Sequence, residues 1–275
     1  MWKLRFGDAL TKEKIPFGYR EVSPAEKKRL VRHAFDEIAR AYDFADTILS
    51  FGLDSGWRKK AVGLLGVGKG DVILDACGGT AGLARLAARE AGPAGQVVVY
   101  DFSRAMMEVG RRRARGPANG APVGFVQGDA EDLSFPGGIF DAVTIGFGFR
   151  NLAHPAKGLR EFIRVLKPGG RLMVLEFSLP VNRLVRALYH AYSFWWMPLA
   201  GRMICGPGGS FRYLAESIRV FPAPEEIAEG IRKAGFANVR FRRLSGGIAV
   251  VYLGAKPAAA GSPPSDGPIS SARGS

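Results

Sequence analysis

Residues 71–82 read DVILDACGGTAG, and this short stretch decides the fold. An apolar run that ends in a glycine-rich loop predicts a buried strand followed by a tight turn. The next residues, LARLAAREAG at 83–92, place apolar side chains at helical spacing, so a helix is expected directly after the loop. Strand, glycine loop and helix in this order indicate a sheet whose strands alternate with helices.

The same alternation continues as far as residue 177. Strands separated by helices of ordinary length pair in parallel through right-handed crossovers, which gives a doubly wound α/β sheet. The further strands expected are QVVVYDF (96–102), PVGFVQGDA (122–130), FDAVTIGF (140–147) and RLMVLEF (171–177), with helices at 103–116 and 153–166.

The rest of the chain divides into a leader, a closing hairpin, an insert and a tail. Only a Ser-Gly-Gly turn separates FANVRFRRL from the apolar run that ends at residue 256, which predicts an antiparallel hairpin at the end of the sheet. The domain is expected to span 24–257. It has a helical lead-in at 24–60 and an aromatic, irregular insert at 181–221, and it lies between an irregular leader (1–23) and a disordered tail (258–275).

Composition narrows the classes of partner. The chain has 275 residues, 47% of them hydrophobic, and a formal charge of +14. The hydrophobic content supports a sizeable core, and the charge favours anionic partners such as nucleic acid or acidic lipid. The basic clusters at 27–29 and 111–113 lie in helix-like stretches, where a solvated helix face is the simpler interpretation.

Cysteine usage and the N-terminus indicate a cytoplasmic protein. Cys77 and Cys205 lie far apart in the sequence, so no disulfide framework is indicated, which suits a reducing compartment. The first 20 residues have no continuous apolar run and are not a secretory signal. No zinc-ligand spacing is present in the sequence, and no metal site is expected.

Acids stand at the carboxyl ends of the first three expected strands, the edge at which open α/β sheets bind ligands. Asp75 lies beside the glycine loop, where it would repel a pyrophosphate but suits a positively charged ligand. Asp101 can accept both hydroxyls of a ribose, and Asp129 with Ala130 can bracket an adenine edge. Each acid alone could instead be a helix cap or turn residue, but the three together favour S-adenosylmethionine, which contains no phosphate.

Several segments between residues 25 and 256 follow one family pattern. They are AFDEIARAYDFADTILSFGLDSGWRKK, LDACGGT, YDFSRAMMEVGRRR, GFGFRNL, RVLKPGGRLMVLEFSLP and FRYLAESIRVFP, in this order. On these segments the chain resembles the ubiquinone/menaquinone biosynthesis C-methyltransferases, which act on polyprenylated quinols. The glycine loop and LKPGG are common to many methyltransferases, whereas AYD, FG-x-RN and YLAESI are more specific.

The resemblance implies a class I S-adenosylmethionine-dependent methyltransferase fold. It also implies methylation of a ring carbon of demethylmenaquinol, with a benzoquinol of the ubiquinone pathway as the alternative acceptor, or both. Gly146 stands where many members carry a serine, so no side-chain role is assigned to it. Ala81 replaces a frequent loop glycine, and the loop there could differ in conformation from that of the family. The strand ends and the resemblance together predict these cofactor-binding residues: Asp75, Gly79, Thr80, Asp101, Asp129 and Ala130.

Arg150 and Asn151 follow the fourth expected strand and are the candidates for acceptor chemistry. Carbon methylation needs an electron-rich ring, so the enzyme must favour a phenolate and hold the reacting carbon in line. We expect Arg150 to stabilise the phenolate or hold a water molecule, with Asn151 orienting it and Tyr42 contacting the ring. The alternative is that Arg150 and Asn151 cap the next helix or form a loop ion pair.

Residues 184–205 combine Trp195 and Trp196 with Arg186 and Arg202, which is typical of an interfacial amphipathic segment. This segment predicts an entrance for a polyprenyl substrate and peripheral contact with the inner face of the cell membrane. An aromatic cover over the sheet, or the contact surface of a homodimer, are the alternatives. Two other functions remain as hypotheses: a small-molecule or phospholipid N-methyltransferase, and a nucleic-acid-binding protein, against which the diffuse charge argues.

Overall fold

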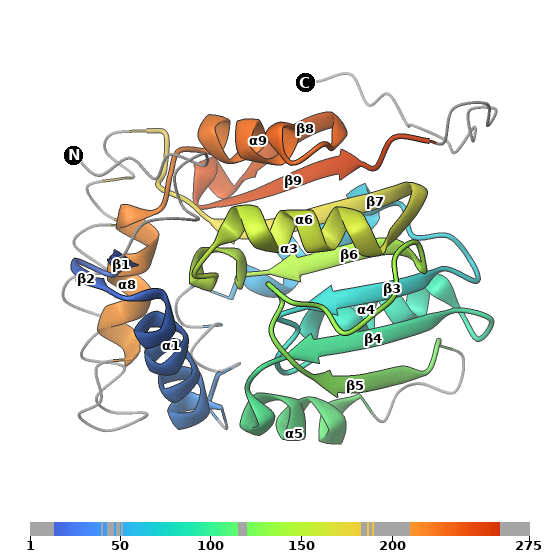
Figure 1. The fold of residues 1–275 in the computed structure, drawn as a ribbon, viewed down its shortest axis with the longest axis horizontal. Helices are drawn as coiled ribbons and strands as arrows, with labels where there is room; N and C mark the ends of the chain where they lie inside the picture. The colour runs from blue at the N-terminus through green and yellow to red at the C-terminus, as the bar shows by residue number, and fades with distance from the viewer. Residues whose placement is uncertain are drawn as a thin grey trace.

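A seven-stranded sheet forms the centre of the molecule, with helices on both faces, in the computed structural model (Figure 1). The structure describes residues 14–39, 41–42, 47, 50, 52–114, 120–182, 186, 189 and 210–258. In spatial order the strands are β5 (Val123–Gln127), β4 (Gln96–Asp101), β3 (Val72–Ala76), β6 (Phe140–Gly146), β7 (Leu166–Phe177), β9 (Ala249–Ala255) and β8 (Ala237–Leu244).

The first five of these strands are parallel, as the sequence predicts. β9 runs antiparallel to both β7 and β8, and the short turn η2 (Ser245–Gly247) joins β8 to β9, so the closing hairpin is confirmed. Residues 167–170 read KPGG, and a Pro-Gly pair predicts a turn there, but these residues are part of β7, which begins at Leu166.

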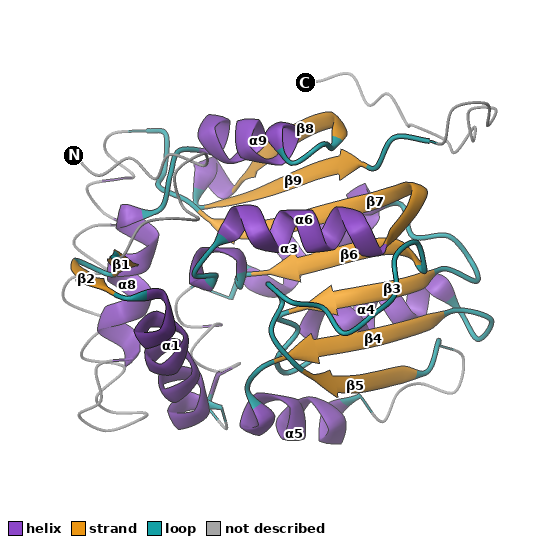
Figure 2. Cartoon of the chain, in the orientation of Figure 1, coloured by secondary structure: helices purple, strands orange, loops and turns teal. Residues whose placement is uncertain are grey.

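Two apolar cores explain the layers, because a parallel sheet buries both of its faces. One face packs against α3 (Asp54–Leu65) and α4 (Gly82–Ala91), and the other against α6 (Pro155–Val165) and α9 (Pro224–Lys233) (Figure 2). Helix α5 (Arg104–Arg113) packs against β4 and β5. Among the described residues, no helix is both long and apolar enough to cross a bilayer.

A third group of elements lies beyond the carboxyl ends of β3, β4 and β6 (Figure 1). It contains α1 (Pro24–Ile38), α8 (Ser210–Val220) and a small antiparallel sheet of β1 (Ile15–Phe17) and β2 (Arg20–Val22). Phe17 of β1 stacks on Tyr213 of α8, with ring centroids 4.1 Å apart. These elements therefore cover the edge of the sheet at which ligands are expected.

This group corrects two sequence predictions. Residues 15–22 were expected in an irregular leader but form a hairpin, because Phe17 and Val22 face the same small core. Residues 210–220 were expected in an irregular insert but form a helix. The aromatic stretch 191–209, most of the lead-in between 40 and 51, and the tail after residue 258 lie outside the described residues.

Candidate active site

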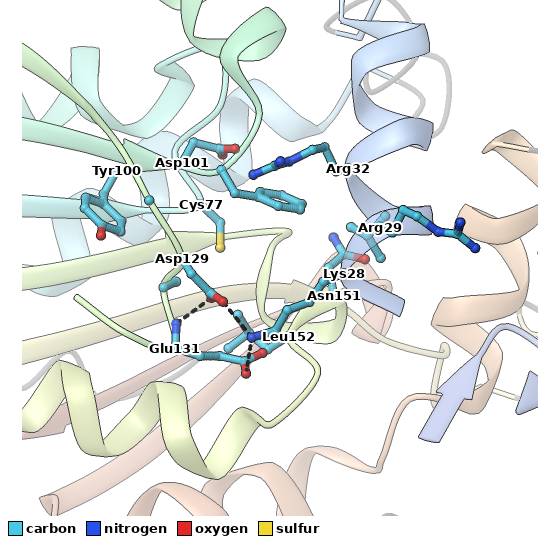
Figure 3. Close-up of a pocket in the computed structure, with 14 residues that line it drawn as sticks. Lys28, Arg29, Arg32, Cys77, Tyr100, Asp101, Asp129, Glu131, Asn151 and Leu152 are labelled. Carbon is cyan, nitrogen blue, oxygen red and sulfur yellow. Dashed lines mark hydrogen bonds and ion pairs between the residues drawn. The ribbon is translucent and has the colours of Figure 1, made fainter. Parts of the chain in front are cut away.

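A hollow of about 360 Å³ opens between α1 and the carboxyl ends of β4 and β5 (Figure 3). We call it the wide hollow. Its floor comes from the strand ends and its wall from α1. The residues that line it are Lys28, Arg29, Val31, Arg32, Cys77, Tyr100, Asp101, Phe102, Gly128, Asp129, Ala130, Glu131, Asn151 and Leu152.

A narrow extension continues from the wide hollow toward the glycine loop and the end of β6. The two spaces share Cys77, Asp101, Phe102 and Asn151. The extension is also lined by Phe35, Tyr42, Arg58, Gly78, Gly79, Thr80, Met106, Gly146, Phe147 and Gly148. The fold thus brings seven sequence-predicted site residues to one connected space: Gly79, Thr80, Asp101, Asp129, Ala130, Asn151 and Tyr42.

Asp101 stands where the two spaces meet. Its carboxylate accepts hydrogen bonds from the backbone N–H of Gly79 at 2.9 Å and of Ser103 at 2.8 Å. Burial raises the pKa of this carboxyl from its ordinary 3.8 to about 6, although the backbone bonds act in the opposite direction. Each carboxylate oxygen has two lone pairs, so Asp101 can still accept a pair of ligand hydroxyls.

Asp129 is held at the far side of the wide hollow. One oxygen accepts the backbone N–H of Glu131 at 2.9 Å, and the other pairs with Lys28 Nζ at 2.6 Å. At the preceding Gly128 any Cβ would collide with the hydroxyl of Tyr100. The backbone before Asp129 therefore lies close to the ring of Tyr100, and only glycine fits there.

Asp75 does not face either space, contrary to the sequence prediction. Its carboxylate accepts hydrogen bonds from Thr144 Oγ1 at 2.7 Å and from the backbone N–H of Ala84 in α4 at 3.0 Å. Burial raises the pKa of Asp75 to about 6. This acid fixes the start of α4 under the glycine loop and acts as the helix-capping residue that was the alternative interpretation.

Arg150 also points away from the two spaces, which corrects its predicted role on the phenolate. Its guanidinium pairs with Glu176 Oε1 of β7 at 2.5 Å and donates to the carbonyl of Phe147 at 2.6 Å. A further bond joins Arg150 Nε to Ser217 Oγ of α8 at 3.3 Å. The side chains of Arg150 and Glu176 are 3% and 0% exposed, so the pair is a buried brace between β7, α8 and the turn η1 (Phe149–Asn151).

Asn151 follows Arg150 in η1, and its side chain lines both the wide hollow and the extension. Its Oδ1 accepts a hydrogen bond from the hydroxyl of Tyr213 at 2.8 Å, and its Nδ2 donates to the carbonyl of Phe147 at 3.4 Å. The Phe147 carbonyl can only accept, so it takes Nδ2, and the amide oxygen is left to accept the hydroxyl of Tyr213. The second N–H of Nδ2 points to no partner that the described residues show and can serve as a donor in the extension, which Tyr42 also lines.

Helix α1 contributes two lysines that the sequence did not predict: Lys28 lines the wide hollow, and Lys27, which lines neither space, holds the backbone next to Asn151. Lys27 is buried and donates to the carbonyls of Arg150 at 3.3 Å and Leu152 at 2.9 Å, and burial lowers its pKa to about 8. Lys28 pairs with Asp129 and, at 2.9 Å, with Glu131 (Figure 3). The interpretation as a solvated face was therefore wrong for Lys27, whereas the side chain of Lys28 is paired but still 36% exposed.

A signal for Lys27 is present in the sequence. It lies four residues before Val31 and eight before Phe35, both of which are buried on the inner face of α1. A lysine at helical spacing from apolar residues lies on the buried stripe of an amphipathic helix, where it needs hydrogen-bond acceptors.

The two departures from the family pattern in the loops have local explanations. Ala81 adopts a φ of 64°, which lies in the left-handed region that favours glycine. A left-handed alanine costs about 1 kcal/mol or more relative to glycine. At Gly146, a Cβ would collide with the side chain of Leu83, and thus this leucine fills the place of a serine side chain.

Comparison with known proteins decides the family. A model of the ubiE/COQ5 methyltransferase family matches residues 22–256. The chain belongs to this family. Two curated relatives, both named ubiquinone/menaquinone biosynthesis C-methyltransferase UbiE, come from Pseudomonas entomophila and Pseudomonas putida. Each is 44% identical over 241 residues, which is 88% of this chain and 94% of the relative.

Solved structures support the same fold for this ubiE/COQ5 family member. A possible histamine N-methyltransferase from Thermotoga maritima gives a TM-score of 0.58 at 21% identity, and covers 82% of this chain and 99% of its own. An S-adenosylmethionine-dependent methyltransferase from Aquifex aeolicus gives 0.53 at 17% identity, with 85% and 98% covered. The predicted class I fold, methyltransferase activity and S-adenosylmethionine as methyl donor are confirmed.

Proposed function

We propose that this enzyme methylates a ring carbon of demethylmenaquinol to give menaquinol, with a benzoquinol of the ubiquinone pathway as the alternative acceptor. The names of the 44% identical relatives support both pathways. The proposal depends on the position of Asn151. This residue lines both the wide hollow and the extension, and its hydrogen bond with Tyr213 leaves the amide N–H as a donor there. The amide N–H of Asn151 is neutral, so it can donate a hydrogen bond to a ring oxygen of the acceptor without taking up the proton of that hydroxyl.

The lining residues fit the methyl donor at both ends. Asp101 would accept the ribose hydroxyls, Asp129 and Ala130 would meet the adenine edge in the wide hollow, and Gly79 and Thr80 would line the methionine end. S-adenosylmethionine supplies an electrophilic methyl group on a sulfonium.

The acceptor side depends on the remaining residues of the extension. Asn151 would donate Nδ2–H to the ring oxygen and stabilise the phenolate in which the ring carbon becomes nucleophilic. Tyr42, which also lines the extension, would contact the ring and exclude water. Arg150 holds the Phe147 carbonyl and thereby positions Asn151, without contact with the ring.

A direct assay tests the acceptor. Purified enzyme is given labelled S-adenosylmethionine with either demethylmenaquinol or the methoxy-polyprenyl benzoquinol, each in detergent and under reducing conditions. We expect labelled menaquinol as the main product. Label only in the benzoquinol would favour the alternative. Label in neither quinol, but in phosphoethanolamine offered in a third reaction, would favour an N-methyltransferase.

The pH dependence of cofactor binding tests the role of Asp101. Because the cofactor would bind the ionised carboxylate, affinity is full above the pKa of about 6 and falls as the pH drops through it. We expect the Kd for S-adenosylmethionine to rise by about tenfold per pH unit below 6, as one linked proton requires. Calorimetry between pH 5 and 8 measures this slope.

Asp101→Asn is the matched control. This variant should bind the cofactor weakly with little pH dependence, because Asp75, which titrates in the same range, does not face the ligand. A wild-type Kd that stays constant from pH 7 to pH 5 would contradict the assignment of Asp101 to the ribose.

Contact with a membrane surface remains a proposal and has one supporting feature. A hollow of about 200 Å³ between α3 and α4 is lined by Arg58, Lys59, Arg85 and Arg89 against the single acid Asp54. Vesicles of anionic lipid should co-sediment the enzyme at low salt, and exchange of Arg85 and Arg89 for Glu should weaken this. Equal sedimentation with neutral vesicles would argue against it.

The homodimer stays a prediction.

A further inference from the structure

Lys27 of α1 is a buried cation that takes no part in the contacts proposed above for the cofactor or the quinol. It is 6% exposed and lines neither the wide hollow nor the extension. Its Nζ donates to the backbone carbonyl of Arg150 at 3.3 Å and to that of Leu152 at 2.9 Å. These two residues directly precede and follow Asn151, so one ammonium holds the chain on both sides of the proposed donor.

Glu131 binds the backbone of the same segment from the other side. Its side chain is 1% exposed, and Oε1 accepts the backbone N–H of Ala153 at 2.6 Å and of His154 at 3.0 Å. Its Oε2 lies 2.9 Å from Nζ of Lys28, the neighbour of Lys27 in α1. The turn η1 and the residues after it are therefore bound by a buried cation and a buried anion, and both groups connect the segment to α1.

A lysine is a costly side chain to bury, so its partners must account for its presence. Burial lowers the pKa of Lys27 to about 8, and the charge of Glu131 acts in the opposite direction. The two carbonyls beside Asn151 supply hydrogen-bond acceptors for the ammonium. The bonds with Tyr213 and Phe147 set the rotation of the Asn151 amide. The main chain from which that amide extends is held by Lys27.

We propose that Lys27 is a positioning residue for methyl transfer, which fixes the place of the Asn151 donor relative to the acceptor ring and makes that place depend on the docking of α1. The inference rests on the proposed role of Asn151 and holds for either quinol. A hydrogen bond weakens when its donor moves out of line, and a misplacement of about 1 Å can cost about 100-fold in rate. The loss should therefore appear in methyl transfer and not in cofactor binding.

A double-mutant cycle of Lys27→Met and Asn151→Ala tests the proposal. The rate of a single turnover at saturating quinol is divided by the number of cofactor sites counted by calorimetry, so unfolded molecules do not contribute. Lys27→Met alone should lower this rate by about 10- to 100-fold and leave the Kd for S-adenosylmethionine unchanged. In the Asn151→Ala background it should cause no further loss, because the donor that it positions is absent. Lys60→Met, at an exposed lysine of α3, is the matched control and should change neither quantity.

An equal loss of rate from Lys27→Met in both backgrounds would overturn the proposal, because Lys27 would then act independently of Asn151. An unchanged rate, or a cofactor Kd that weakens together with the rate, would also overturn it. If Lys27→Met forms no cofactor sites, Lys27→Gln, which keeps a neutral N–H donor, replaces it in the cycle. Absence of sites in both variants would assign Lys27 to folding instead.

Failure of the proposed donor gives a different result in the same cycle. Wild-type turnover in Asn151→Ala alone would refute the role of Asn151, and the role of Lys27 with it. A slow Asn151→Ala with an equal further loss from Lys27→Met would refute only the role of Lys27.

Discussion

Arg150→Met is expected to lower the free energy of unfolding by about 3–5 kcal/mol, because it leaves Glu176 as a buried charge without its partner. The same substitution removes the bonds to the Phe147 carbonyl and to Ser217, and so releases the turn that presents Asn151. Turnover should fall together with stability. Urea unfolding of the apoprotein, followed by circular dichroism, measures the change.

Two further variants make the result specific to the buried pair. Adding Glu176→Gln to Arg150→Met removes the lone charge but keeps an oxygen for the backbone N–H of Arg150, so part of the stability should return. Arg243→Met breaks the exposed pair with Glu225 and should cost less than about 1 kcal/mol. If Arg150→Met unfolds like the wild type, binds cofactor and yet has no turnover, Arg150 acts on the acceptor directly and the brace interpretation is wrong.

Asn151→Ala is expected to reduce kcat by about 100- to 1000-fold, the usual effect of removing one donor to a developing oxyanion. The Kd for S-adenosylmethionine should change little, because in the proposed arrangement other residues of the wide hollow would bind the adenine and the ribose. Single-turnover methylation of the quinol, with cofactor binding measured in parallel, separates the two effects.

Tyr213→Phe is the control that keeps the ring but removes the hydroxyl. It frees the Asn151 amide to rotate, and we expect a loss of about tenfold in kcat with the stack on Phe17 retained. Asn151→Asp keeps the acceptor for Tyr213 but places a negative charge beside the phenolate, so it should be at least as damaging as the alanine variant. Full turnover in Asn151→Ala would remove this residue from the mechanism.

Much of the site could be predicted because it depends on local rules. Parallel strands end at a common edge, so acids and glycines at successive strand ends must converge, and Gly79, Asp101, Asp129 and Ala130 do so. Lys27 could have been predicted as well, since its helical spacing from Val31 and Phe35 marks the buried face of α1.

Other residues could not be placed from the sequence, because their partners come from distant segments. Asp75 looks like Asp101 as a strand-end acid, yet it caps α4 and is bonded by Thr144, 69 positions away. Arg150 and Asn151 are neighbours in η1. Only the position of Glu176 in β7 decides that Arg150 is buried in the protein core, while Asn151 faces the site.

The sequence by itself determined the alternating strands and helices, the closing hairpin and the edge of the sheet at which the cofactor is proposed to bind. These follow from periodicity, glycine positions and chain connectivity, which are properties of neighbouring residues. Only the tertiary structure decided which polar side chains face the site. A buried polar or charged group must be paired, and the pairs form across 26 residues for Arg150 with Glu176 and across 62 for Asn151 with Tyr213. Chain folding alone brings such partners together.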